Sequence, residues 1–314
     1  MFKILNSLDI SGVPEVNEIF KNHNLVNVEA DRKVVLSEIE NCDAYLASAA
    51  IEVDKEFLEK ANKLKVIGSP STGTDHMDLE LIKQKGIICY DISKEFDLIN
   101  SFTATSELAF TLLLSLIRKI VPASLDAKNG IWSREKYSGT QLFNKTFGII
   151  GLGRLGEISA RIAKGFGMNV IACDIKEKNI PYVKMMDLLS VAKQSDFISV
   201  HVHLNKETVN LVDKAFFRNM KKSALIVNTS RGKIINEKDL IIALKENEIG
   251  GACLDVIDGE WLEPNALFQH PLIKYSRSNN NLILSPHIGG ATKESIYGAR
   301  IFMAKKIATF LNVI

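Results

Sequence analysis

The segment Phe147-Gly-Ile-Ile-Gly-Leu-Gly-Arg-Leu-Gly156 decides the fold of the second half of this chain. An apolar run leads directly into Gly151, Gly153 and Gly156, and a stretch with helical spacing follows. At such a strand–helix junction the first glycine permits a tight turn and the second lets the main chain approach a pyrophosphate. The third lets the helix pack closely on the strand. The amides that open the helix then face the phosphates. The segment therefore predicts a dinucleotide-binding βαβ unit.

A carboxylate at the end of the next apolar run supports this interpretation. Val170–Cys173 is followed by Asp174, about 20 residues after Gly156, where dinucleotide-binding domains place the acid that hydrogen-bonds the adenosine ribose. Such an acid repels the 2′-phosphate of NADP. The sequence therefore favours NAD, although the nearby Lys176 leaves the strictness of that preference open.

The same alternation of short apolar runs and helix-like stretches extends in both directions along the chain. It is typical of parallel sheets built from βαβ units. We therefore predict an α/β protein with two Rossmann-like domains, since 314 residues suffice for two cores. The predicted strands of the first domain are Lys3–Leu8, Ala44–Ala49, Lys65–Ser69 and Ile87–Tyr90. Those of the second, doubly wound domain are Phe147–Ile150, Asn169–Cys173, Phe197–Val202, Ala224–Asn228, Gly251–Val256 and Leu282–Ser285.

Two longer helical stretches set the predicted domain boundaries. Ser101–Ile120 is apolar on most of its faces, which is typical of a buried helix that carries the chain between domains. Lys293–Leu311 follows the last strand and is expected to return to the first domain. We therefore assign residues 1–99 and 291–314 to the first domain and residues 100–290 to the second.

The composition argues against several classes of partner. Lys and Arg number 39 against 37 Asp and Glu, so the bulk charge of +2 indicates neither a nucleic acid nor an anionic membrane as partner. The most apolar helical run, Leu108–Ile117, is well short of the roughly 20 residues that a membrane span needs. The N-terminal residues lack the features of a signal peptide. The cysteines are far apart and form no metal-binding pattern, so we expect no metal site and a cytoplasmic location. They are Cys42, Cys89, Cys173 and Cys253.

Three later segments each place polar residues at the end of an apolar run, where open α/β sheets bind their ligands. They are Ile226–Gly232, Leu254–Glu260 and Leu284–Gly290. Reduction of a 2-keto acid needs a cation that holds the carboxylate, an acid that protonates the carbonyl oxygen, and a carboxylate that orients this acid. Arg231, His287 and Glu260 meet these needs in that order. Each also fits a purely structural role, and their spacing alone does not show that they meet in space.

In this order, the motifs resemble those of the D-isomer-specific 2-hydroxyacid dehydrogenases over nearly the whole chain. The matching segments are GLGRLG (Gly151–Gly156), HVHLNKET (His201–Thr208), NTSRG (Asn228–Gly232), GACLDV (Gly251–Val256) and SPHIGGAT (Ser285–Thr292). The resemblance implies hydride transfer between NAD(H) and a small D-2-hydroxy or 2-keto acid. It assigns the substrate carboxylate to Arg231 and the acid–base pair to His287 and Glu260.

The resemblance also implies where cofactor and substrate bind. The implied cofactor contacts are Gly151, Gly153, Arg154, Leu155, Gly156, Asp174, Thr229, Asp255, Gly289 and Gly290. The second domain is then the NAD-binding domain, and the first is a flavodoxin-like substrate lobe. In that lobe, main-chain amides at Thr72 and Gly73 correspond to those that hold the substrate carboxylate. Family members are usually dimers joined through the cofactor domain, which implies a homodimer with Val121–Asn144 as its arm.

Departures from the family pattern keep the substrate open. Trp261 stands where a proline usually follows the glutamate, and it fits either the substrate pocket or local packing. His203 also stands where the family often has proline. Ser48 stands where phosphoglycerate-specific members carry an arginine, which weakens 3-phosphoglycerate dehydrogenase of serine biosynthesis as an alternative without excluding it. An alternative of another class is an NAD-sensing scaffold, since transcriptional corepressors share this fold.

Overall fold

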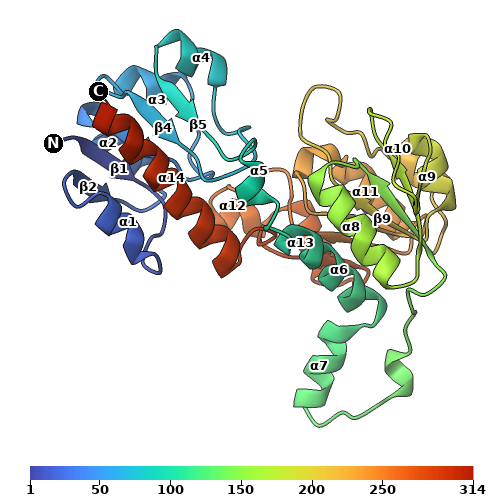
Figure 1. The fold of residues 1–314 in the computed structure, drawn as a ribbon. Helices are drawn as coiled ribbons and strands as arrows, with labels where there is room; N and C mark the ends of the chain where they lie inside the picture. The colour runs from blue at the N-terminus through green and yellow to red at the C-terminus, as the bar shows by residue number, and fades with distance from the viewer. Residues whose placement is uncertain (314) are drawn as a thin grey trace. The chain divides into compact units, whose positions relative to one another are not determined.

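The computed structural model describes residues 1–313, and its chain divides into two compact units. Unit 1 contains Met1–Phe102 and the chain from Ala291 onward, and unit 2 contains Thr103–Gly290. Each unit has one sheet whose paired strands all run parallel, with helices packed on it (Figure 1). The predicted α/β fold with two Rossmann-like sheets is confirmed.

The sheet of unit 1 has five strands in the order β2-β1-β3-β4-β5. This is the strand order of flavodoxin-like folds. The strands are β1 (Lys3–Asn6), β2 (Asn24–Asn27), β3 (Ala44–Leu46), β4 (Val66–Gly68) and β5 (Ile88–Tyr90). Strand β2 was not predicted. It lies at the edge of the sheet and its residues are only partly buried or exposed, so its sequence lacks the apolar run of a central strand.

Three helices of unit 1 begin where an aspartate accepts hydrogen bonds from main-chain N–H groups of the first turn. Asp31, Asp54 and Asp78 cap α2, α3 and α4 in this way. The helices are α1 (Pro14–Ile19), α2 (Arg32–Glu38), α3 (Lys55–Lys60), α4 (Leu79–Gln84), α5 (Phe96–Ile99) and α14 (Lys293–Val313), with a 3₁₀ turn at Ile39–Asn41. Helix α14 packs on β4, where a Cβ at Gly68 would lie 2.7 Å from Met303 Sδ. The C-terminal helix therefore completes the core of unit 1.

The sheet of unit 2 has seven strands in the order β12-β11-β10-β9-β6-β7-β8. They are β6 (Thr146–Ile150), β7 (Asn169–Cys173), β8 (Val183–Met185), β9 (Phe197–Val200), β10 (Leu225–Asn228), β11 (Gly251–Leu254) and β12 (Leu282–Leu284). The strand order reverses between β6 and β9, and this switch point is where doubly wound sheets bind their ligands. The unpredicted strand β8 is again an edge strand without fully buried residues.

Two apolar clusters cover the two faces of this sheet. Phe110 and Leu113 of α6 pack with Phe147 on one face, while Phe216 and Leu240 lie in the cluster on the other. The helices of the unit are α6 (Ala104–Ile117), α7 (Ile120–Lys128), α8 (Arg154–Gly165), α9 (Leu188–Gln194), α10 (Lys214–Asn219), α11 (Glu237–Lys245), α12 (Pro264–Phe268) and α13 (Pro271–Ser276). Two 3₁₀ turns cover Glu135–Tyr137 and Gly232–Ile234.

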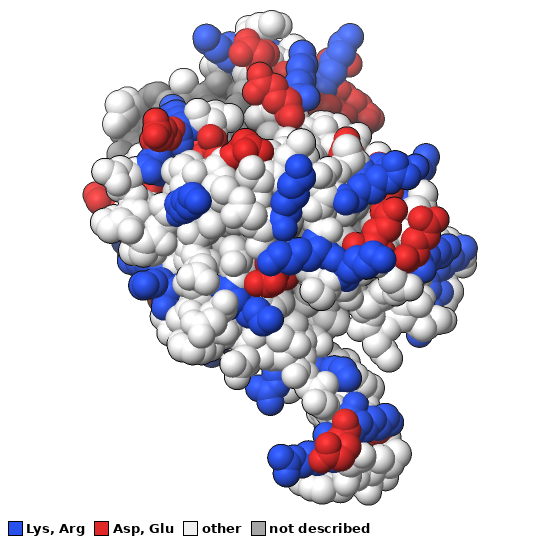
Figure 2. Space-filling model, turned by 90° about the vertical axis from the view of Figure 1, so that its right-hand side faces the viewer, with Lys and Arg blue, Asp and Glu red and all other residues white. Residues whose placement is uncertain are grey.

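The long helix predicted for Ser101–Ile120 is shorter than expected, because the chain turns at Lys119. The φ of Lys119 is 53°, in the left-handed region, and α7 starts at the next residue. Helix α7 has no buried residue and projects away from the rest of unit 2 (Figure 1). Acidic and basic side chains are both visible on the projecting segment (Figure 2).

Among residues 1–313 no single helix is long and apolar enough to cross a membrane. The bent pair Phe96–Ile117 and Ile120–Lys128 passes that test together, by length and composition only. Its two parts meet at 63°, and α6 within it contributes Phe110 and Leu113 to the core of unit 2.

Candidate active site

The glycine loop between β6 and α8 has the geometry that its sequence predicts. Gly151 has φ +91°, and a Cβ there would lie 2.6 Å from the carbonyl oxygen of His201. A Cβ at Gly156 would lie 2.2 Å from the carbonyl oxygen of Gly151, so only glycine lets α8 approach the strand this closely. At Gly153, in contrast, a Cβ would meet nothing within 4 Å. Open space therefore adjoins the start of α8, which suits a pyrophosphate on the helix N-terminus.

Asp174 lies beside this loop at the end of β7. Its carboxylate accepts hydrogen bonds from the main-chain N–H of Leu152, at 2.6 Å, and of Lys176, at 2.8 Å. The acid is thus held next to the glycine turn, as a ribose-binding acid must be. The next two predicted contacts, Arg154 and Leu155, are the first residues of α8. Burial lowers the pKa of the Arg154 guanidinium. The carbonyl of Leu155 accepts a hydrogen bond from Ser106 Oγ.

His201 supports the same loop from β9, a role that the sequence did not reveal. Its Nε2 lies 3.0 Å from Ser159 Oγ of α8 and 2.9 Å from Ser199 Oγ. Burial lowers the pKa of this imidazole to about 4, so the ring is neutral at physiological pH. His201 therefore links β9 to α8 through the hydroxyls of Ser199 and Ser159.

The segment after β10 forms a compact turn that carries Arg231. Asn228 Oδ1 accepts the N–H of Ser230, and its Nδ2 donates to the carbonyl of Arg231. The Arg231 guanidinium donates from Nη1 to the carbonyl of Ser230 at 2.8 Å. Thr229 is 7% exposed, and its buried Oγ1 has no hydrogen-bond partner in the described part of the chain. A buried hydroxyl in that state calls for a partner such as a water or a ligand, and the contact of Thr229 with the cofactor stays a prediction.

The segment after β12 is fixed by Asp255, which is 1% exposed. One carboxylate oxygen accepts Ser285 Oγ–H and the N–H of Ile288, and the other accepts the N–H of Gly289. The carbonyl of Asp255 accepts the N–H of His287 at 2.8 Å. Asp255 therefore fixes the conformation of the loop that carries His287. Its contact with the cofactor stays a prediction. Of the predicted pair Gly289 and Gly290, the first lies against this carboxylate and the second has open space at its Cβ position.

His287 and Glu260 meet, as the sequence predicts. His287 Nδ1 lies 2.7 Å from Glu260 Oε1, and the side chains are 31% and 17% exposed. Because a carboxylate oxygen accepts, Nδ1 carries the hydrogen, and the opposite ring nitrogen, Nε2, is left for a substrate. His287 has φ 53°, a conformation that costs a non-glycine residue roughly 1–3 kcal/mol and that clusters at functional sites.

The segments of Arg231 and Glu260 touch through their main chains. A Cβ at Gly232 would lie 2.1 Å from the carbonyl carbon of Ile257 and 2.3 Å from the nitrogen of Asp258. Only glycine permits this contact, which the sequence gave no means to predict. It brings the main chain that follows Arg231 against the main chain that leads to Glu260.

Trp261 also lies at this site, beside the histidine. Its ring centroid is 5.8 Å from that of His287, and the residue is 59% exposed. That exposure leaves little local packing, and a place of Trp261 in the substrate pocket stays a prediction.

The predicted substrate contacts, Thr72 and Gly73, lie in a loop of unit 1. Ser71 Oγ hydrogen-bonds Ser69 Oγ at 2.9 Å and donates to the carbonyl of Gly73 at 2.6 Å, so hydroxyls within the loop fix its course. The role of these residues toward a substrate stays a prediction.

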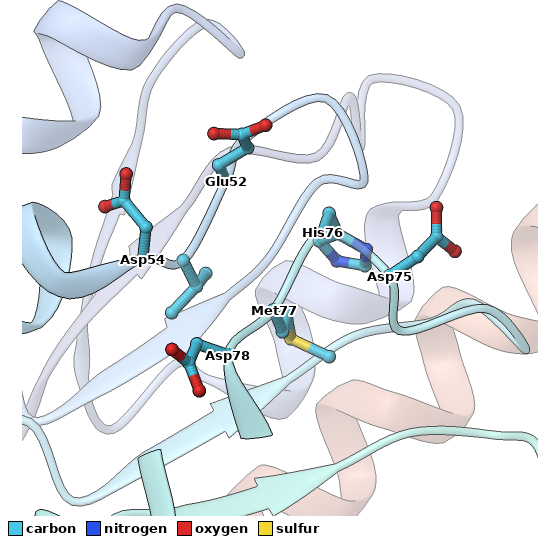
Figure 3. Close-up of a pocket in the computed structure, with 7 residues that line it drawn as sticks. Glu52, Asp54, Asp75, His76, Met77 and Asp78 are labelled. Carbon is cyan, nitrogen blue, oxygen red and sulfur yellow. The ribbon is translucent and has the colours of Figure 1, made fainter. Parts of the chain in front are cut away.

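A hollow of about 230 Å³ in unit 1 has the wrong charge for an anionic substrate (Figure 3). It is lined by Glu52, Val53, Asp54, Asp75, His76, Met77 and Asp78. Asp54 pairs with Arg32 and caps α3, and Asp78 caps α4, so these acids have structural tasks. No group of side chains able to hold a metal ion is found among residues 1–313.

The chain is similar to known proteins over most of its length. Residues 110–289 match the model of the D-isomer specific 2-hydroxyacid dehydrogenase NAD binding domain. The chain is 36% identical to a glyoxylate reductase of Thermococcus litoralis, over 89% of this chain and 83% of that protein. It is 34% identical to a D-3-phosphoglycerate dehydrogenase of Methanocaldococcus jannaschii over 90% of its own length, but it spans only 52% of that enzyme.

A solved structure shares nearly the whole fold. The D-lactate dehydrogenase of Aquifex aeolicus, complexed with NAD and lactic acid, superposes with a TM-score of 0.87 at 26% identity. The match covers 99% of this chain and 96% of that one. Together with the glycine loop, Asp174 and the paired His287 and Glu260, these matches place the chain in the family of D-isomer-specific 2-hydroxyacid dehydrogenases, NAD-binding oxidoreductases.

Proposed function

We propose that this protein interconverts small 2-keto acids and D-2-hydroxy acids with NAD(H). Bound NADH supplies the hydride that reaches the carbonyl carbon. Arg231 holds the substrate carboxylate through its planar guanidinium, and protonated His287 gives a proton from Nε2 to the carbonyl oxygen. In the oxidative direction neutral His287 takes that proton back. The observation that carries the proposal is the 2.7 Å contact between His287 Nδ1 and Glu260 Oε1.

Glu260 orients the ring and stabilises the charged form of His287. One carboxylate oxygen bonds Nδ1, and the other, Oε2, is buried without a hydrogen-bond partner among residues 1–313. A carboxylate in contact with Nδ1 attracts the imidazolium and fixes the direction in which Nε2 points.

We propose NAD over NADP because Asp174 is held beside the glycine turn by two main-chain N–H groups. Its fixed negative charge would repel a 2′-phosphate.

The substrate is proposed to be a short 2-keto acid such as glyoxylate or pyruvate. Support comes from the glyoxylate reductases among the relatives and from the lactate held by the A. aeolicus enzyme. A phosphorylated substrate would need a cation, whereas Ser48 offers a hydroxyl and its N–H is bonded to Ser7 Oγ.

NADH oxidation should be measured with glyoxylate, hydroxypyruvate, pyruvate, bulkier 2-keto acids and phosphohydroxypyruvate. Turnover with a short unphosphorylated acid supports the proposal. A preference for phosphohydroxypyruvate would replace it with phosphoglycerate oxidation. Tight NADH binding without turnover of any of these acids would favour an NAD-sensing scaffold.

We also propose a homodimer joined through the segment that begins with α7. Ile120, Val121 and Leu125 of this helix are each more than half exposed, and Trp132 after it is 89% exposed. Such apolar surface on a projecting element is typical of a protein contact, and a second copy supplies the same surface. Leu125→Glu should shift the mass measured by light scattering to that of a monomer, whereas Leu189→Glu, at another partly exposed leucine, should not. An unchanged mass for Leu125→Glu would contradict this assignment.

A further inference from the structure

A second histidine–glutamate pair, less exposed than His287 and Glu260, lies in the same unit. Glu237 is the first residue of α11, and His270 directly precedes α13. His270 Nε2 lies 3.3 Å from Glu237 Oε2, and the side chains are 8% and 17% exposed. Sequence reasoning did not single out either residue.

Both side chains of this pair hold the main chain of Asp258. Glu237 Oε1 accepts the N–H of Asp258 at 2.7 Å, and His270 Nε2 lies 3.0 Å from the carbonyl oxygen of Asp258. His270 Nδ1 accepts the N–H of Leu272, so the ring hydrogen is on Nε2 and that nitrogen donates. The N–H and the C=O of one residue are thus both fixed by a single polar network.

Asp258 stands two residues before Glu260, and Gly259 between them turns the chain with φ +80°. Asp258 itself is exposed, so apolar packing does little to fix this stretch. On its other side, the main chain at Ile257 and Asp258 rests against Gly232, the residue after Arg231. The network therefore acts where the segment that carries Glu260 meets the segment that carries Arg231.

We propose that Glu237 and His270 are positioning residues that hold the Glu260 segment in register and so set the orientation of the His287 ring. This inference rests on the proposed role of His287 as the acid. It extends the site by one layer: the pair fixes Asp258, Asp258 fixes Glu260, and Glu260 fixes His287. An error near 1 Å in such a chain is enough to lower turnover by roughly 100-fold.

Three variants and one control test this arrangement. His270→Leu removes the donor to the carbonyl of Asp258, whereas His270→Gln places an amide N–H near the position of Nε2. Glu237→Gln keeps an acceptor for Asp258 N–H but sets its NH₂ against His270 Nε2–H. The control is Asp196→Asn, because Asp196 also accepts a main-chain N–H, that of Thr146, at 2.8 Å. That contact lies at the amino ends of β6 and β9, away from the site.

Kinetics of these variants should separate kcat from KM. We expect His270→Leu and Glu237→Gln to lower kcat by roughly tenfold or more, with KM for the keto acid and Kd for NADH within about threefold of wild type. His270→Gln should recover most of the loss, and Asp196→Asn should keep wild-type kcat. Equal losses of kcat in the control and in His270→Leu would reduce the pair to a structural role and overturn the proposal.

A measurement independent of turnover separates this inference from the proposed function. In ¹⁵N-labelled protein, the ring proton on His287 Nδ1 is assigned by its loss in His287→Gln. His270→Leu and Glu237→Gln should shift this resonance, and Asp196→Asn should leave it unchanged. A shift in an enzyme without keto-acid turnover would keep the positioning pair and refute only the chemistry. An unchanged resonance in folded His270→Leu and Glu237→Gln would overturn the positioning pair whatever the activity.

Discussion

His287 Nδ1 lies 2.7 Å from Glu260 Oε1, and His287 holds this contact with a left-handed main chain. The strain is balanced by Asp255, whose carboxylate and carbonyl accept hydrogen bonds from Ser285, His287, Ile288 and Gly289. The turn holds the main chain of His287, and the contact of Nδ1 with Glu260 orients its ring. This fixed direction is what a proton donor to a bound carbonyl requires.

Glu260→Gln should weaken reduction by removing the charge that stabilises protonated His287. The amide can still bond Nδ1, so the ring stays near its place while the imidazolium loses its partner. We expect kcat to fall by roughly 10- to 100-fold, whereas Kd for NADH stays at the wild-type value. Steady-state rates and titration of NADH fluorescence give the two quantities. A wild-type kcat in Glu260→Gln would mean that the charge is unnecessary and that Glu260 acts by shape alone.

Arg231→Ala should chiefly impair binding of the keto acid. Loss of a two-pronged charged contact lowers kcat/KM by roughly 100-fold, while Kd for NADH changes little. Arg231→Lys should recover only part of this loss, because an ammonium lacks the planar fork. Full recovery in the lysine variant would show that charge suffices and that the fork is unnecessary.

Asp174→Ala should loosen the preference for NADH over NADPH by at least about tenfold, because the charge facing the 2′-phosphate is gone. The ratio of kcat/KM for the two cofactors measures this. Asp174 also bonds two main-chain N–H groups, so Asp174→Asn, which keeps an acceptor, separates charge from loop geometry. If neither variant changes the ratio, the ribose is bound elsewhere.

Glu237 should make the protein less stable as pH rises. Burial raises the pKa of this carboxyl from 4.5 to about 7, so the folded protein holds the proton more tightly than the unfolded chain does. The resulting stabilisation is complete below pH 4.5 and is lost as pH rises through 7, by up to about 3 kcal/mol. Urea unfolding of Glu237→Gln should therefore show a smaller fall in the free energy of unfolding between pH 5 and 8 than wild type. An equal fall would place the titration in another group.

Local patterns in the sequence predicted most of what positions the site. The glycine loop, Asp174 and the polar ends of β10, β11 and β12 follow from strand periodicity and from the chemistry of one motif each. The edge strands β2 and β8 were not predicted, because partly exposed strands carry no continuous apolar run in the sequence. The turn at Lys119 was not predicted because the residue that turns the chain is neither glycine nor proline, and the one local signal is Pro122, three residues later.

The second layer of the site could not be predicted because it depends on contacts between residues far apart in the sequence. Gly232 looks like any loop glycine until the main chain of Ile257 is placed against it. In the sequence, Glu237 looks like an acid in the first turn of a helix, and His270 looks like a polar residue before a proline. Only the fold brings both side chains onto the main chain of Asp258. A sequence period records which face a residue takes, not which partner it meets.

Turnover of His287→Gln tests the central claim most directly. With glyoxylate or pyruvate and saturating NADH, the account predicts that kcat falls by roughly 100-fold or more, while NADH binding, measured by fluorescence, stays at the wild-type level. Turnover within a few-fold of wild type, in a variant that binds NADH normally, would contradict it.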